Sequence, residues 1–204
     1  ITAVVLIPFA GVMVKLSTMI VRDEKEKAPR HPELNTLDEK LYISPAVALA
    51  ETTKAVAYMG SLAKKNYAMG CRQLLTYEES LCAEIDEDEQ YLDKFADDSD
   101  RFMIGLAKVV ESESEDRQLD MLMQAVPSFE RIGDYAVNLV ELAERLQAES
   151  AVFSETAKKE MNILFTAVNE ILTITMDAFT SDDNEKAKSI EPLEETIDDM
   201  VMML

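Results

Sequence analysis

The fold is decided by residues 112–148, which read SESEDRQLDMLMQAVPSFERIGDYAVNLVELAERLQA. Ser112 and Glu115 have the spacing of a capping box, in which the two side chains bind exposed backbone N–H groups and start a helix. The pattern predicts one long helix over 115–148, because apolar residues then recur every three or four positions, as on the buried face of a helix. These residues are Leu119, Leu122, Val126, Phe129, Ile132, Ala136, Val140 and Ala143.

Similar start signals occur twice before this stretch. Ser44-Pro45 places an N-cap before a proline, and Thr76 to Glu79 has the capping-box spacing. No segment alternates apolar and polar residues as a strand does, and 5 glycines and 6 prolines leave little material for turns. The sequence therefore predicts an all-α antiparallel helix bundle. The expected helices are 44–75, 79–110, 115–148, 154–180 and 183–204.

The N-terminal part of the chain has a different composition. Residues 1–21 are apolar apart from Lys15, and a helix needs about 20 such residues to cross a bilayer. They are predicted to be the end of a transmembrane helix, with an apolar helix packed on the bundle as the alternative. Residues 22–43 carry mixed charge and prolines, which predicts a linker, and basic residues next to a span favour the cytoplasmic side.

The charge of the chain is strongly acidic and uneven. The formal net charge is −20, which disfavours binding to nucleic acid or to anionic lipid. Residues 78–100 carry a net charge of −10, whereas residues 45–77 carry +3. The two cysteines cannot form a disulfide framework, so a reducing compartment such as the cytoplasm is expected.

Acidic pairs at four-residue spacing recur in three of the predicted helices. Glu130 and Asp134 share one helix face, and Asn138 extends their row by a turn. Like charges at this spacing repel one another, and a metal ion held by oxygen ligands would relieve the repulsion. The alternative is a set of solvated acidic faces with Lys94 and Arg131 as counter-ions. The same spacing recurs in two further pairs, Glu89 with Asp93 and Glu194 with Asp198. Gly133 indicates close approach of a neighbouring helix or a ligand.

Residues 129–138, FERIGDYAVN, resemble the signature of PhoU-like proteins, which reads approximately LERIGDHAxN. The chain departs from that signature at Phe129 and Tyr135. Residues 89–95 are similar to the acidic pattern on the preceding helix of the family. The layout of the chain also resembles that of bacterial Na+/phosphate cotransporter proteins, which carry a PhoU-like domain after their last transmembrane helix. In both, an apolar segment is followed by a charged linker and then by such a bundle.

This resemblance implies two three-helix repeats, with residues 44–150 as the first and residues 151–204 as an incomplete second. It also implies a multinuclear metal cluster, with iron, manganese, magnesium or zinc as candidate ions. The resemblance nominates ligands in the first repeat, which are Glu89, Asp93, Glu130, Asp134 and Asn138. In the second repeat it nominates Glu194 and Asp198. Their cluster would be incomplete, because the third helix of that repeat, which carries further ligands, is missing.

The function that the resemblance implies is regulation of phosphate transport by a cytoplasmic domain at the cell membrane. Its expected partners are the transmembrane transporter core of the same polypeptide and a second copy of the chain. No catalysis is expected, because the sequence lacks a nucleophile constellation and a glycine-rich phosphate loop. The alternatives are a helical interaction scaffold without metal and a carboxylate-bridged dimetal enzyme. The single histidine, His31, disfavours the enzyme, because ferritin-like sites use histidine on the bundle helices.

Overall fold

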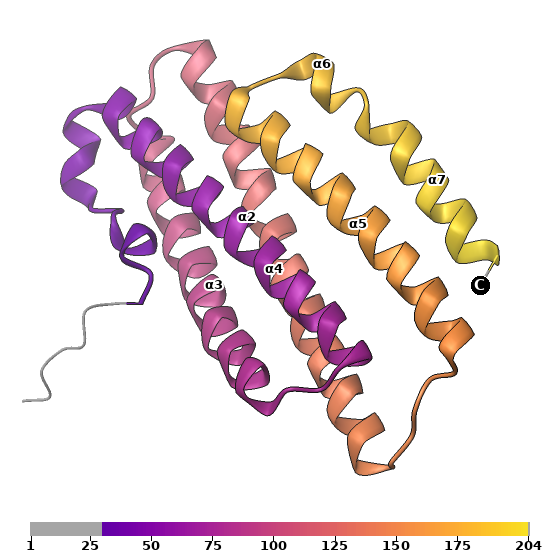
Figure 1. Ribbon diagram of the computed structural model, residues 1–204. Helices are drawn as coiled ribbons and strands as arrows, with labels where there is room; N and C mark the ends of the chain where they lie inside the picture. The colour runs from indigo at the N-terminus through magenta and orange to yellow at the C-terminus, as the bar shows by residue number, and fades with distance from the viewer. Residues whose placement is uncertain (1–29, 204) are drawn as a thin grey trace, which may run out of the picture. The chain divides into compact units, whose positions relative to one another are not determined.

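The computed structural model describes residues 30–203 and divides the chain into two units, residues 1–32 and residues 33–204 (Figure 1). No strand occurs in the part of the chain that the structure describes, and the prediction of an all-α fold is confirmed. The predicted transmembrane segment, residues 1–21, lies outside the described residues. The long helices of the described residues all belong to the second unit.

Three long helices form the first part of this unit: α2 (Pro45–Leu75), α3 (Glu79–Leu106) and α4 (Glu113–Ala148). Each helix runs antiparallel to the one before it in the chain, and short connections join them (Figure 1). At the start of α4 the Ser112 hydroxyl accepts a hydrogen bond from the backbone N–H of Glu115 at 3.2 Å, as an N-cap should. All three helices contribute to one apolar core, which includes Val56, Met59, Leu92, Phe95, Met103, Leu119 and Leu122.

Glycines allow the helices of this bundle to approach closely. A Cβ at Gly70 of α2 would lie 2.9 Å from the carbonyl oxygen of Ala136 in α4. A Cβ at Gly133 of α4 would lie 2.8 Å from Cδ1 of Leu92 in α3. Both distances are shorter than non-bonded atoms tolerate, so a larger residue would have to displace the backbone of α4 at Gly70 and the end of the Leu92 side chain at Gly133. The expectation that Gly133 marks the approach of a neighbouring helix is confirmed, and that helix is α3.

The second part consists of α5 (Glu155–Ser181), the short α6 (Asn184–Ala187) and α7 (Ile190–Met203). Helix α5 lies along α2, and α7 lies along the other side of α5 (Figure 1). Few side chains of this part are buried. Helix α5 buries only Met176 and Ala178, and α7 buries none of its described residues. Helix α5 is also the one described helix whose length and composition would suit a membrane span.

The predicted helix 183–204 is wrong, because the chain forms two helices there, α6 and α7. Asp182 adopts a left-handed conformation with φ 52° and ends α5, and the Asp183 side chain then caps α6. Pro192 gives the reason for the break after α6. A proline lacks the N–H that a continuous helix would use at this position, so the helix restarts two residues earlier and places Pro192 in its first turn.

The end of the predicted linker is packed against the bundle. Residues 33–43 include most of η1 (Pro32–Asn35) and all of η2 (Glu39–Ile43), two short 3-10 helices. Leu34 is buried in the apolar core, and the Tyr42 hydroxyl donates a hydrogen bond of 2.9 Å to the carbonyl oxygen of Phe102. The bundle therefore begins before α2.

Candidate metal centre

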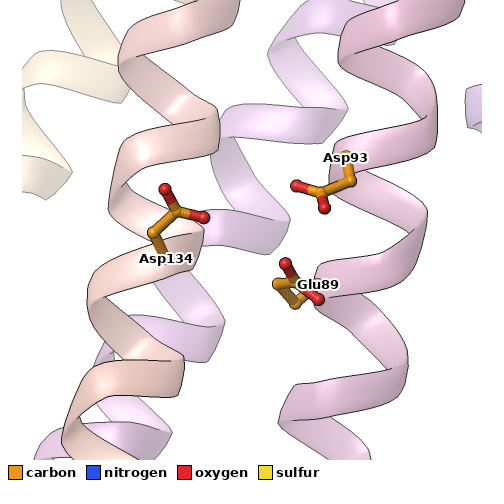
Figure 2. Close-up of side chains that lie close together, drawn as sticks. All are labelled: Glu89, Asp93 and Asp134. Carbon is orange, nitrogen blue, oxygen red and sulfur yellow. The ribbon is translucent and has the colours of Figure 1, made fainter.

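Three carboxylates converge between α3 and α4. Glu89 and Asp93 project from successive turns of α3, and Asp134 faces them from α4 (Figure 2). One carboxylate oxygen of each residue lies within 4.8 Å of an oxygen of the other two. Two oxygens bound to one cation at about 2.0–2.6 Å are at most about 4–5 Å apart, so the three groups could ligate a single ion.

The positions of these carboxylates follow from the packing of the two helices. Glu89 and Asp93 are four residues apart and share a face of α3. Leu92, the residue before Asp93, is buried and meets Gly133, the residue before Asp134. The contact between Leu92 and Gly133 thus holds α3 and α4 close enough for the acids beside it to face one another.

Burial and neighbouring negative charge both act on the protonation of Glu89 and Glu130. The pKa of Glu89 is raised to about 7 by burial first, and then by the charge of Asp93, a hydrogen bond with Asp93 and the charges of Asp134 and Asp86. The pKa of Glu130 is also raised, by burial and by the charges of Asp134, Asp93 and Asp97, although Arg131 opposes this shift. Negative charge is therefore poorly compensated where these acids of α3 and α4 face one another.

The nearby basic side chains compensate these acids only weakly. Within residues 30–203, neither Lys94 nor Arg131 forms an ion pair, although the charge of Arg131 lowers the pKa of Glu130 against the other causes. On another face of α3 the acids are paired with a cation. Nζ of Lys65 in α2 lies 2.7 Å from Oε1 of Glu84 and 3.4 Å from Oδ2 of the buried Asp88.

The donor set of the cluster fits a hard cation. All of its ligand atoms are carboxylate oxygens, which suit magnesium, calcium, manganese or iron, and it contains no histidine or cysteine. A cation would relieve the repulsion among Glu89, Asp93 and Asp134 and would replace the proton that Glu89 otherwise retains.

The other nominated residues lie apart from these three oxygens. Glu130 is one turn before Asp134 on α4 and shares its electrostatic environment, while Asn138 is exposed one turn after it. Glu194 and Asp198 are exposed on α7, and among the described residues no third acid, histidine or cysteine joins them in a cluster. That Glu130, Asn138, Glu194 and Asp198 are metal ligands stays a prediction.

Asp97 is a further acid near the cluster that the predicted ligand set does not include. It lies one turn after Asp93 on α3, and its charge raises the pKa of Glu130 on α4. A sequence signal for it exists, because Glu89, Asp93 and Asp97 form one row at four-residue spacing.

Comparison with known proteins gives two matches. The chain is 25% identical over 197 residues to the "Putative inorganic phosphate export protein YjbB" of Salmonella typhimurium, an alignment that covers 91% of this chain and 34% of the relative. The chain thus spans about a third of the length of that relative. No solved structure matches. The family described as PhoU domain matches residues 56–143, so the carboxylate cluster of α3 and α4 lies within a segment similar to the PhoU domain.

Proposed function

We propose that this chain is a PhoU-like regulatory domain of a membrane protein that moves phosphate with sodium. The observation that carries the proposal is the facing set of carboxylates on α3 and α4, inside the segment similar to the PhoU domain. The relative named as a phosphate export protein supports the choice of phosphate. The domain lies on the cytoplasmic side of the cell membrane, where its partner is the transmembrane core of the same polypeptide.

In this function Glu89, Asp93 and Asp134 hold a divalent or trivalent cation, with Glu130 and Asn138 next to them on α4. A bound cation would supply positive charge where the acids of α3 and α4 face each other. Glu89 gives up its proton to bind it, and Asp134 links α4 to the two ligands on α3. Occupancy therefore fixes the spacing of α3 and α4, which gives the domain a metal-dependent shape to present to its partner.

In this proposal the domain regulates phosphate transport and does not catalyse a reaction.

The competing function is a helical scaffold that binds a partner without metal. It is favoured by the apolar residues exposed on α5 and α7, such as Ile163 and Met202. A dimetal enzyme is the weaker alternative, because the cluster holds no histidine. A second copy of the chain is a further candidate partner.

The test measures phosphate flux through the full-length membrane protein in cells that lack other phosphate transporters. Asp134→Asn should change the flux at a given phosphate concentration, because it removes the carboxylate of α4 that faces Glu89 and Asp93. Asp120→Asn is the matched control, since it makes the same chemical change at an exposed acid of α4 outside the cluster, and it should leave the flux unchanged. Equal fluxes in the wild type, in Asp134→Asn and after deletion of the domain would contradict the proposal.

A further inference from the structure

Three hollows follow one another between α2 and α5, away from the carboxylate cluster, and together they make up the α2–α5 groove. Ser61 and Thr180 line the hollow at one end, and Tyr67 and Phe165 line the middle one. The middle hollow and the one at the far end share Leu75 and Asn162 among their lining residues, so these two join. From Asn162 to Thr180 the groove follows α5 for about 27 Å, at 1.5 Å per residue.

The charge of this groove is opposite to that of the chain. Its acids are Asp177 and Glu155, and they are outnumbered by its cations, Lys64, Lys65, Arg72, Lys158 and Lys159. Lys65 and Arg72 pair with acids of the α3 segment, and Lys158 pairs with Glu155. Within residues 30–203, neither Lys64 nor Lys159 has an ion pair, and these two lysines lie toward opposite ends of the groove.

The middle of the groove is apolar and amidic. Tyr67 and Leu75 line it from α2, and Phe165, Asn162 and Asn169 line it from α5. A ligand of matching pattern would carry apolar residues at its centre and acids toward its two ends. A groove between two antiparallel helices accepts a third helix, whose side chains pack between theirs.

A small anion fits this groove less well than a helix does. The hydroxyls of Ser61 and Thr180 donate hydrogen bonds of 3.0 Å and 2.8 Å to the carbonyl oxygens of Ala57 and Met176 in their own helices. The hydroxyl hydrogens are therefore not directed at a bound oxyanion, which would be left with the lysines as its hydrogen-bond donors at that end of the groove. An anionic membrane is disfavoured as well, because the rest of a chain of net charge −20 would be repelled by it.

We propose that the groove between α2 and α5 is a docking site for an acidic amphipathic helix of a partner protein. Lys64 and Lys159 bind its carboxylates, and Tyr67, Leu75 and Phe165 contact its apolar face. The site does not depend on metal or on the proposed role in phosphate transport, so either can fail without the other.

The test is a selection of random 18-residue peptides displayed on phage, with the whole chain as target. Enriched peptides should carry Asp or Glu toward both ends and apolar residues between them. The double substitution Lys64→Glu with Lys159→Glu should weaken their binding at least about tenfold. Lys54→Glu with Lys188→Glu is the matched control, because it makes the same charge change at lysines outside the groove and should leave binding within about twofold.

Several results would overturn the proposal. One is a selection that enriches no peptide, or only neutral or basic ones. Another is equal binding of the enriched peptides to both double variants. Self-association of the chain that is lost in Lys64→Glu with Lys159→Glu, measured by sedimentation, would assign the groove to a second copy. Binding to anionic vesicles that the same variant abolishes would assign it to a membrane.

Discussion

The bundle of α2, α3 and α4 and the pair of α5 and α7 are built from similar amphipathic helices, yet they differ in burial and in the setting of their acids. Each helix of the bundle contributes many buried residues, whereas α5 buries two and the described part of α7 none. Glu89 and Asp93 face Asp134 from a neighbouring helix, although Asp93 and Asp134 are exposed, whereas no acid of another described helix forms such a cluster with Glu194 and Asp198. An acidic row therefore becomes a candidate metal site only where a second helix brings another acid to face it.

The largest expected difference between the two regions is in the cost of removing a phenylalanine. Phe95→Ala in α3 should lower the free energy of unfolding by about 3–5 kcal/mol, because Phe95 is fully buried in the core of the bundle. Phe165→Ala in α5 should cost about 1–2 kcal/mol, because Phe165 is only half-buried. Urea denaturation followed by circular dichroism measures both losses, and equal losses would show that the two regions are packed alike.

A second prediction concerns how rigid the tight contacts of the bundle are. Gly70→Ala should destabilise the protein by about 1–3 kcal/mol, because the new Cβ meets the backbone of α4, which cannot rotate away. Gly133→Ala should cost less than about 1 kcal/mol. There the Cβ meets the end of the Leu92 side chain, which can turn, and alanine favours the helix.

Thermal melting of the two glycine variants in parallel measures this order. A larger loss for Gly133→Ala would mean that the contact of α3 with α4, rather than that of α2 with α4, is the rigid one. Neither α5 nor α7 contains a glycine, so the test concerns the bundle alone.

The sequence predicted most of the fold because the helix signals are local. The Ser112 cap, the Ser44-Pro45 start and the apolar stripe of α4 depend on residues within a few turns of one another. The break after α6 was missed, although Pro192 marked it, because the apolar periodicity continues across the proline.

The candidate site could be predicted only in part. Spacing alone places Glu130, Asp134 and Asn138 in one row, but it does not reveal which acids another helix faces. That depends on the contact between Leu92 and Gly133, which joins residues far apart in the sequence. For this reason Asp134 lies in the cluster with Glu89 and Asp93, Asn138 lies exposed one turn beyond, and Asp97 was overlooked.

The smallest of the expected effects is the pH dependence of the metal-free protein. The pKa of Glu89 is raised to about 7 from an ordinary value of 4.5, so the folded state holds a proton that the unfolded state has released between these pH values. The contribution of Glu89 to stability should therefore fall as the pH rises from about 4.5 to about 7.

Urea denaturation at a series of pH values, with a chelator present, measures this dependence. Glu89→Gln should flatten it, because glutamine does not titrate. The matched control Glu194→Gln, on the exposed face of α7, should retain the dependence of the wild type. A dependence that Glu89→Gln leaves unchanged would mean that the bundle acids do not repel one another as the geometry requires.

The most direct test of the metal centre is the number of metal ions that one chain binds. The protein is stripped with a chelator and titrated calorimetrically with Mn2+, first as the wild type, then as Asp134→Asn, and then as the control Asp120→Asn, which changes an exposed acid of α4 outside the cluster. We predict that the wild type and the control Asp120→Asn bind at least one ion per chain, and that Asp134→Asn loses this binding because the cluster loses the carboxylate that faces Glu89 and Asp93. Equal binding by Asp134→Asn and the wild type, or no binding by any of the three, would contradict the claim that α3 and α4 form a metal centre.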